Sequence, residues 1–242
     1  MNLAKEFDQI VHKRRSVRIY DNDFLFDESA VSRSLERAVL APNSSNMQLW
    51  AFYRVKSKAI KEQLVHACMH QSAAKTANEL IVFVTKISNW KANAQWNLEN
   101  MKRQFEGKEL TTKDKRALAY YTKLMPLFYK NDFWGFNTLL RKIIIGYMGL
   151  KKPIIRLTNE ADQRIMCHKS VALAAQTFML SMTAEGYDTC PMEGFDKNLV
   201  KKILKLGKTD EITMIVACGK GKPEGIYSER TRLPIEKVIF TL

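Results

Sequence analysis

The feature that most constrains the fold is a long apolar stretch in the C-terminal half of the chain. Thr158 or Asn159 can cap a helix that runs to about Gly186. Its middle reads VALAAQTFMLSMTA and is apolar on almost every face. Such a helix is covered on all sides, so it must lie in a core or in a subunit interface.

Three further helices are predicted from capping residues and helical spacing. The first covers residues 27–41, since Asp27 can cap it and Pro42 stops it. The second begins at Ser57 and places apolar residues on one face. The third covers residues 196–206, with Gly207 as its C-cap.

Apolar runs predict strands between these helices. ELIVFVTKI at 79–87 and EITMIVAC at 211–218 are typical of buried strands, and residues 51–56 form a shorter one. Since helices separate the strands, we expect an α/β or α+β layer fold with a small sheet. The apolar segment 233–242 is too long to hang free in water, so it should dock on another surface, a partner subunit among the candidates.

Residues 90–156 differ in character from the rest. They are helical in pattern, carry three of the four tryptophans, and hold fourteen Lys and Arg against five Asp and Glu. Within them, 134–150 predicts a buried or covering helix. No linker rich in Gly, Pro or Ser flanks the segment, so we interpret it as an insertion in a single domain that spans residues 1–242.

Composition restricts the class of protein. The chain is 46% hydrophobic and 26% charged, which is globular, and no apolar run reaches membrane-spanning length. The N-terminus lacks the apolar core of a secretory signal. Four widely spaced cysteines in apolar contexts predict buried free thiols in a reducing cytoplasm.

The net charge of +14 leaves two interpretations open. Basic proteins often bind nucleic acid or anionic surfaces. The excess is spread along helical sequence, however, which favours a solvated face or a funnel for anionic substrates. No motif that reads DNA or RNA is present.

Two segments near the N-terminus offer polar groups to a ligand. Arg14-Arg15-Ser16-Val17-Arg18 places three guanidiniums and a hydroxyl in five residues, and arginine suits phosphates because its planar fork donates paired hydrogen bonds. Residues 42–48, PNSSNMQ, form a loop dense in amides and hydroxyls. Taken alone, the first segment is better explained as a solvated helix end and the second as an ordinary loop.

Two later segments have similar character. Residues 191–196, PMEGFD, follow the apolar helix, and Gly194 would allow a ligand to approach the backbone closely. In Arg230-Thr231-Arg232 the two arginines of an extended chain point the same way and could meet one phosphate. The structural alternatives are a turn for residues 191–196 and a charged tail for residues 230–232.

The four motifs in this order resemble the nitroreductase family of FMN-dependent oxidoreductases. The matching pattern is R-x-S-x-R, then P-x-S-x-N-x-Q-x-W, then P-x-E-G-F after a long buried helix, then R-x-R-x-P. The resemblance covers roughly residues 8–86 and 160–235. It implies a small mixed, mainly antiparallel sheet flanked by helices, in an intertwined homodimer with FMN at the interface.

The resemblance also assigns roles to residues. Arg14, Ser16 and Arg18 would contact the phosphate, the ribityl chain and the flavin pyrimidine edge, with Arg15 adjoining through its backbone. Residues of the loop would reach the flavin of the other subunit, and those of the later turn would lie along the isoalloxazine with the Gly194 N–H near N5. The loop residues are Pro42, Asn43, Ser44 and Asn46, the turn residues are Pro191, Glu193 and Gly194, and Arg230 and Arg232 would close on the phosphate.

One departure from the family pattern concerns the flavin N1/O2 edge. Many members carry a lysine just before the second core strand, whereas this chain reads His70-Gln71-Ser72-Ala73-Ala74-Lys75. Lys75 or Arg18 would take that role. The pair His66 and His70 has a spacing that zinc sites use, but without an acidic partner two surface histidines are the favoured interpretation.

The family implies a chemistry in which NAD(P)H, either NADPH or NADH, delivers hydride to flavin N5 in a ping-pong cycle. A flat acceptor such as a nitroaromatic or a quinone then takes up the hydride from the flavin. The insertion would roof this pocket and supply aromatic rings for stacking; these are Trp90, Trp96, Phe128, Phe133 and Trp134.

Three alternatives remain open at this level. The chain could be a dehalogenase-like or flavin-modifying enzyme of the same superfamily. It could be a basic module that binds nucleic acid or a membrane surface without turnover. It could also carry or sense FMN without catalysis. We expect no catalytic side chain and no metal, because the cofactor performs the chemistry.

Overall fold

A four-stranded antiparallel sheet forms the centre of the structure. The computed structural model describes residues 2–130 and 134–242. Strands β1 (Trp50–Val55), β2 (Glu79–Thr85), β3 (Asp188–Met192) and β4 (Glu211–Gly219) lie in the order β1-β2-β4-β3. The α+β class is thus confirmed.

The expectation of a mixed sheet is wrong for these four strands, because every neighbouring pair is antiparallel. Consecutive strands run in opposite directions in the pairs β1–β2 and β3–β4, whereas β2 and β3, which are both antiparallel to β4, run in the same direction on either side of it. A parallel pairing does occur at a single-residue bridge, between Ser16 and Thr189.

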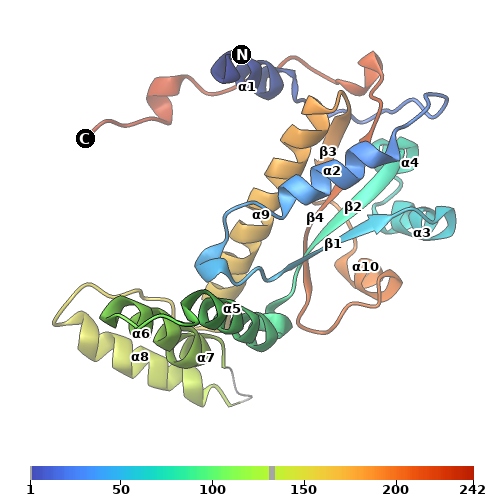
Figure 1. Ribbon diagram of the computed structural model, residues 1–242. Helices are drawn as coiled ribbons and strands as arrows, with labels where there is room; N and C mark the ends of the chain where they lie inside the picture. The colour runs from blue at the N-terminus through green and yellow to red at the C-terminus, as the bar shows by residue number, and fades with distance from the viewer. Residues whose placement is uncertain (1, 131–133) are drawn as a thin grey trace.

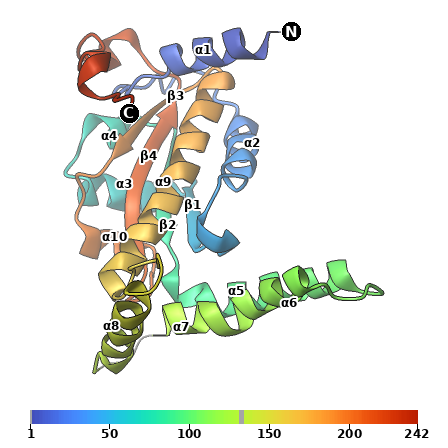
Figure 2. The same cartoon turned by 90° about the vertical axis from the view of Figure 1, so that its left-hand side faces the viewer.

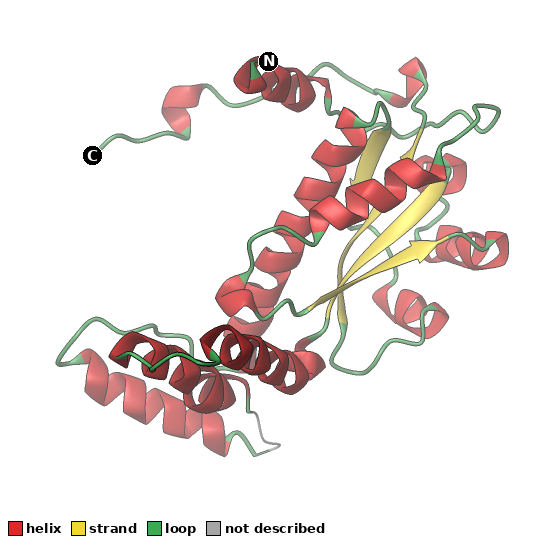
Figure 3. Ribbon diagram, in the orientation of Figure 1, coloured by secondary structure: helices red, strands yellow, loops and turns green. Residues whose placement is uncertain are grey.

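Helices cover both faces of the sheet (Figure 3). Helices α2 (Glu28–Ala38) and α9 (Glu160–Ala184) lie on one face, and α3 (Lys58–Ala67), α4 (Ser72–Thr76) and α10 (Lys197–Ile203) lie on the other. Alternate residues of β2 therefore enter two different cores. Leu80 and Val82 pack on the α3 side, and Ile81 and Phe83 pack against α9.

Helix α9 is the long apolar helix that the sequence predicts. Asn159 caps it in a reciprocal arrangement with Asp162, and Glu185 ends it. Its central residues, such as Val171 and Phe178, are fully buried. Part of α9 is uncovered by this chain, since Ile165 and Leu173 are 54% and 47% exposed.

Several boundaries differ from the predictions. Helix α2 ends at Ala38 because Val39 and Leu40 turn the chain before Pro42 is reached. Helix α10 ends at Ile203, since Lys205 with φ +50° takes the left-handed conformation that was assigned to Gly207.

Strand β3, helix α4 and helix α1 (Leu3–Lys13) were not predicted. Helix α1 carries apolar residues at helical spacing (Leu3, Phe7, Ile10 and Val11), although none of its residues is buried, whereas α4 and β3 are only 5 residues long and carry no clear periodic pattern.

The predicted insertion is helical and packs at the N-terminal end of α9 (Figure 2). It consists of α5 (Trp90–Phe105), α6 (Thr112–Ala119), a π-helical turn (Tyr120–Leu124), α7 (Met125–Tyr129) and α8 (Phe136–Gly149). A third apolar cluster attaches it to the body; its buried members are Met47, Leu49, Ala94, Met125, Tyr129 and Cys167.

Helix α8 only partly fits the expectation of a buried or covering helix. It covers α7 with one face, while Leu139 and Ile143 on the other are 57% and 60% exposed. No helix in the described parts of the chain is long and apolar enough to cross a membrane. The four cysteines are free and buried, as predicted.

The C-terminal segment leaves the body at the same end of the molecule as α1 (Figures 1 and 2). Its apolar side chains are exposed, with Ile239 at 61% and Phe240 at 75%. The described residues of this chain therefore do not provide the surface on which we expected this segment to dock.

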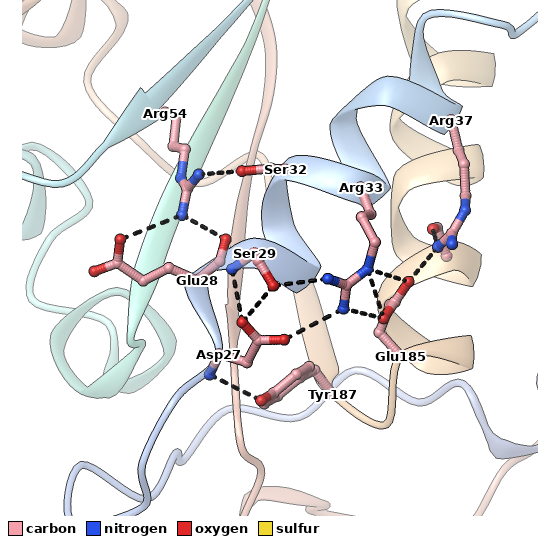
Figure 4. Close-up of polar contacts among 10 residues, drawn as sticks. Asp27, Glu28, Ser29, Ser32, Arg33, Arg37, Arg54, Glu185 and Tyr187 are labelled. Carbon is pink, nitrogen blue, oxygen red and sulfur yellow. Dashed lines mark hydrogen bonds and ion pairs between the residues drawn. The ribbon is translucent and has the colours of Figure 1, made fainter.

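An ion-pair network fastens α2 to the end of α9 (Figure 4). Glu185 accepts hydrogen bonds from Arg33 at 2.6 Å and from Arg37 at 2.5 Å. Arg33 also reaches Asp27, the N-cap of α2, at 3.2 Å. These hydrogen bonds, chiefly those from Arg33, lower the pKa of the Glu185 carboxyl to about 2.

We expect Glu185→Gln to lower the free energy of unfolding by roughly 1–2 kcal/mol at neutral pH, a modest value because both arginines are half exposed to solvent. A carboxyl whose pKa is lowered on folding stabilises the fold above its unfolded pKa, and this contribution is lost as the pH falls towards the folded value. Urea unfolding should therefore show a difference from wild type at neutral pH that shrinks near about pH 3. Glu36→Gln, an exposed change on α2, is the matched control, and an equal loss in both variants would contradict the assignment.

Candidate functional site

Five arginines gather around a polar cavity at the α1 end of the molecule. The segment after α1 meets β3 and the segment after β4 there: Val17 N donates to Thr189 O of β3 at 3.1 Å, and Arg18 N donates to Gly225 O at 2.9 Å. The cavity has a volume of about 180 Å³. Its charged lining consists of Arg14, Arg15, Arg18, Arg230, Arg232 and Glu229, and Ser16 lines it as well.

The five arginines differ in the contacts that their guanidinium groups already make within the protein. Arg230 donates to the carbonyl oxygens of Val11 and His12 at the end of α1, at 3.4 and 2.9 Å, and also to that of Arg14. Arg18 lies over the ring of Tyr227, 5.0 Å from its centroid. Arg232 donates to the neighbouring Thr231 carbonyl and Arg15 to that of Ser228, whereas the Arg14 side chain forms no hydrogen bond with the described residues.

The cavity concentrates positive charge. Burial lowers the pKa of Arg14, and the nearby charges of Arg230 and Arg232 lower it further. Within residues 2–130 and 134–242, no carboxylate forms an ion pair with these five arginines. A doubly charged anion such as a phosphate ester would relieve this repulsion and accept several charge-assisted hydrogen bonds.

The loop after α2 has an unusual backbone. Ser45, Asn46 and Gln48 have φ of 57°, 49° and 49°, a conformation that costs energy for residues other than glycine. Asn43 accepts a hydrogen bond from Gln48 N at 2.8 Å, and the Ser44 N–H donates to Ser170 of α9 at 3.3 Å. Pro42 and Asn46 are exposed.

Side chains of the insertion hold this strained loop. Asn97 donates to the Asn46 carbonyl at 2.8 Å and accepts from the Asn46 side chain at 3.0 Å. Asn93 donates to the carbonyl oxygens of Met47 and Gln48 at 2.8 and 3.1 Å. The loop geometry thus depends on α5, and backbone strain of this kind clusters at ligand sites.

Two tyrosines of the insertion bind the same loop. Tyr120 lies 2.5 Å from the Ser45 hydroxyl, and Tyr121 donates to the Ser45 carbonyl at 2.9 Å. The sequence analysis did not select Asn93, Asn97 or these tyrosines. The available signal was the spacing of the two asparagines, four residues apart on one helix face.

The third motif lies where β3 ends. Pro191 pairs with Val216 within the sheet, and Glu193 and Gly194 are exposed. Gln71, directly before α4, donates its side-chain amide to the Gly194 carbonyl and would contact a Cβ at Gly194 at 3.1 Å. A close approach of this kind favours glycine, and Gln71 is a further residue that the sequence did not select.

The structure brings three of the four motifs together and separates the fourth. Arg14–Arg18, Arg230–Arg232 and β3 share one end of the molecule, since Ser16 bridges to Thr189. The loop at 42–48 contacts α9 at Ser170, whereas the arginine cavity lies beyond the other end of α9 at Glu185. Fifteen helical residues span about 20 Å, so one FMN cannot be expected to contact both halves within a single chain.

Other candidate residues occupy varied places. Lys75 is exposed on α4, which a Tyr20–Thr76 hydrogen bond ties to the arginine segment. His66 and His70 lie side by side, 3.4 Å apart, and no metal-binding cluster occurs in the described residues.

Most of the aromatic side chains that were predicted to roof the pocket pack against other residues or are exposed to solvent. Trp90 stacks on Tyr129 at 6.0 Å, and Trp96 and Trp134 are 53% and 88% exposed. Phe128 lines an apolar cavity between α7 and α8. Phe133 lies outside the described residues.

An antiparallel sheet between helical layers, a cavity of arginines and a strained amide-rich loop are features suited to a phosphorylated, hydrogen-bonding ligand. The family model described as Nitroreductase family matches residues 11–220. The chain belongs to this family of oxidoreductases, which confirms the resemblance seen in the sequence.

Known proteins are similar over almost their full length. DrgA of Synechocystis is 26% identical over 237 residues, which cover 96% of this chain and 94% of that protein. The oxygen-insensitive NADPH nitroreductase of Helicobacter pylori is 22% identical, with coverage of 92% and 90%. A protein of Exiguobacterium sibiricum, solved in complex with FMN, has a TM-score of 0.67 at 23% identity, with coverage of 98% and 97%.

We expect Asn97→Leu to loosen the loop at residues 42–48. Asn97 is buried, so the change leaves the Asn46 carbonyl and amide without their partner and should cost roughly 1–3 kcal/mol in the free energy of unfolding. Hydrogen exchange of the backbone amides at 44–49 should accelerate relative to those of β2. Gln95→Leu, on the exposed face of α5, is the control; unchanged exchange in Asn97→Leu would show that the loop does not depend on α5.

Proposed function

We propose that this chain is an FMN-dependent NAD(P)H oxidoreductase that reduces an organic electron acceptor. The observation that carries the proposal is the cavity of five arginines, which suits the phosphate of FMN in charge and hydrogen-bonding capacity. Family membership and the FMN complex of the Exiguobacterium protein support the same cofactor.

The residues present fit this cofactor. Arg14, Arg18 and Arg232 would bind the phosphate and the pyrimidine edge, with Ser16 on the ribityl chain and Arg15 adjoining. Arg230 would act mainly through its position, since its donors hold the end of α1. Pro191, Glu193 and Gly194 would line the isoalloxazine. When bound, FMN supplies a ring system that accepts a hydride and passes it on.

A second copy of the chain would complete the site. Pro42, Asn43, Ser44 and Asn46 would reach the cofactor of the other subunit, because their own arginine cavity is about 20 Å away along α9. The exposed apolar side chains of α9 and of the C-terminal segment support an intertwined homodimer. A monomeric mass for the FMN-loaded protein in sedimentation equilibrium would contradict it.

The chain's own residues would govern a ping-pong cycle. NADPH or NADH would deliver its hydride and leave, and a flat acceptor such as a nitroaromatic or quinone would then occupy the same space. Positive charge from Lys75 or Arg18 near the pyrimidine edge would stabilise the negative charge that reduction places there. Parallel lines in double-reciprocal plots would support this cycle, and intersecting lines would oppose it.

We further propose that residues 1–242 form one domain in which 90–156 is a helical insertion. Four buried free thiols support residence in a reducing compartment such as the cytoplasm. Burial raises the pKa of the Cys68 and Cys167 thiols to about 11 and about 12, so neither suits nucleophilic chemistry. Two separate unfolding transitions would argue against a single domain.

The decisive experiment is the visible spectrum of the purified protein during anaerobic addition of NADPH and then NADH. We expect a yellow protein that bleaches with at least one of them and regains colour with a quinone. A colourless protein that FMN cannot reconstitute would overturn the proposal and favour a basic binding module. Bleaching without recovery by any acceptor would indicate an FMN carrier, and altered products would indicate a dehalogenase-like or flavin-modifying enzyme.

We expect Arg232→Gln to weaken FMN binding about tenfold or more, since a charge-assisted hydrogen bond to a phosphate is lost. The dissociation constant can be measured by flavin fluorescence at fixed ionic strength. Arg116→Gln removes the same charge from the exposed surface of α6 and serves as the control. Equal affinities in the two variants would show that Arg232 does not contact the cofactor.

A further inference from the structure

The apolar cavity between α7 and α8 has walls that are mostly aliphatic. Its volume is about 410 Å³, within the range of pockets for small organic molecules. One wall is a face of α8 with residues at helical spacing, formed by Arg141, Ile144, Ile145 and Met148. These positions span about 10 Å along the helix axis.

The other walls come from two separate segments. Leu124, Leu127 and Phe128 project from the π-helical turn and α7, and Ile154, Ile155 and Leu157 from the segment before α9. Arg141 fixes these walls, since its buried guanidinium donates to the carbonyl oxygens of Phe128 at 2.9 Å and Thr158 at 2.8 Å. The cavity is therefore preformed by bonds within the protein.

Besides Arg141 and Tyr129, the polar side chains of the cavity lie at the strained loop. Ser44 and Ser45 line it together with Tyr120, whose hydroxyl lies 2.5 Å from that of Ser45. This is the loop that the proposed function places against the flavin of the other subunit. The cavity thus leads from the proposed reaction site into aliphatic surroundings.

The shape of this lining does not suit a purely flat substrate. Aromatic rings are a minority of the lining: Tyr120, Phe128 and Tyr129 contribute three, against ten side chains of Leu, Ile and Met. A flat ring would leave much of the aliphatic wall without contacts, whereas methylene groups fill such a space and lose their contact with water.

We propose that this cavity binds the linear aliphatic tail of a quinone whose ring is reduced at Ser44 and Ser45. The inference rests on the proposed function and specifies its substrate class. NAD(P)H and one proton reduce the quinone to the quinol: the ring gains two electrons, each carbonyl oxygen gains a proton, and NAD(P)⁺ leaves. The tail takes no part in the chemistry and contributes binding alone.

The first test compares kcat/KM of the FMN-loaded enzyme for benzoquinones that carry a methyl, hexyl or decyl side chain. Each methylene that enters the cavity should raise kcat/KM about fourfold until the cavity is full. Equal values along the series, with the methyl compound still reduced, would overturn the tail site and leave the proposed function intact.

A pair of variants tests whether this cavity causes the dependence of kcat/KM on the length of the tail. Met148→Trp fills the cavity and should reduce the decyl-to-methyl ratio of kcat/KM about tenfold or more, which corresponds to the loss of two or more methylenes. Ile143→Trp adds the same ring to the exposed face of α8 and should keep the wild-type ratio. An unchanged ratio in Met148→Trp would overturn the assignment to this cavity.

A binding measurement separates this inference from the redox function. Decyl alcohol carries the tail without a reducible ring, and its calorimetric titration should show binding with a negative heat-capacity change. Met148→Trp should weaken that binding about tenfold or more and Ile143→Trp should not. Binding of decyl alcohol without reduction of any quinone or nitroaromatic would refute the proposed function and retain the tail site, and absence of binding would refute the tail site.

Discussion

The need to bury α9 is the constraint on which the rest of the structure depends. Its apolar surface covers one face of the sheet and packs against α2, and the ion pairs of Glu185 fix its C-terminal end. The same helix supports the strained loop near its N-terminal half through Ser170. With 25 residues, α9 is about 37 Å long, so it keeps the two halves of the proposed site apart. A single chain of this architecture therefore presents half-sites that suit a twofold assembly.

The helical segment at 90–156 contributes to the proposed site in two physically different ways. Its polar side chains on α5 and the π-helical turn satisfy the backbone of the loop at 42–48, which would otherwise be costly to hold in left-handed conformations. Its aliphatic side chains on α7 and α8 enclose the cavity beside that loop. A segment that the sequence marks as basic and aromatic thus acts chiefly through amides, hydroxyls and aliphatic groups.

Local sequence patterns predicted the elements that are buried on regular faces. The continuous apolar runs of β2 and β4 predicted strands because both faces of the sheet are covered. Strand β3 was missed because it is short, includes Pro191 and owes its place to pairing with β4, which is a long-range contact. In the described residues the parallel component expected of the sheet is limited to the bridge between Ser16 and Thr189, since strand direction depends on how distant segments pair.

The sequence by itself determined the residue types of the site and the order of its motifs, because guanidiniums, amides and glycine have fixed chemistry wherever they lie. It also determined that one helix must be covered on nearly all sides. Only the tertiary structure decided which arginines are committed to the backbone, which side chains hold the loop, and that a cavity opens beside it. These properties depend on distances between residues far apart in the chain, and such distances are set by packing rather than by any local pattern.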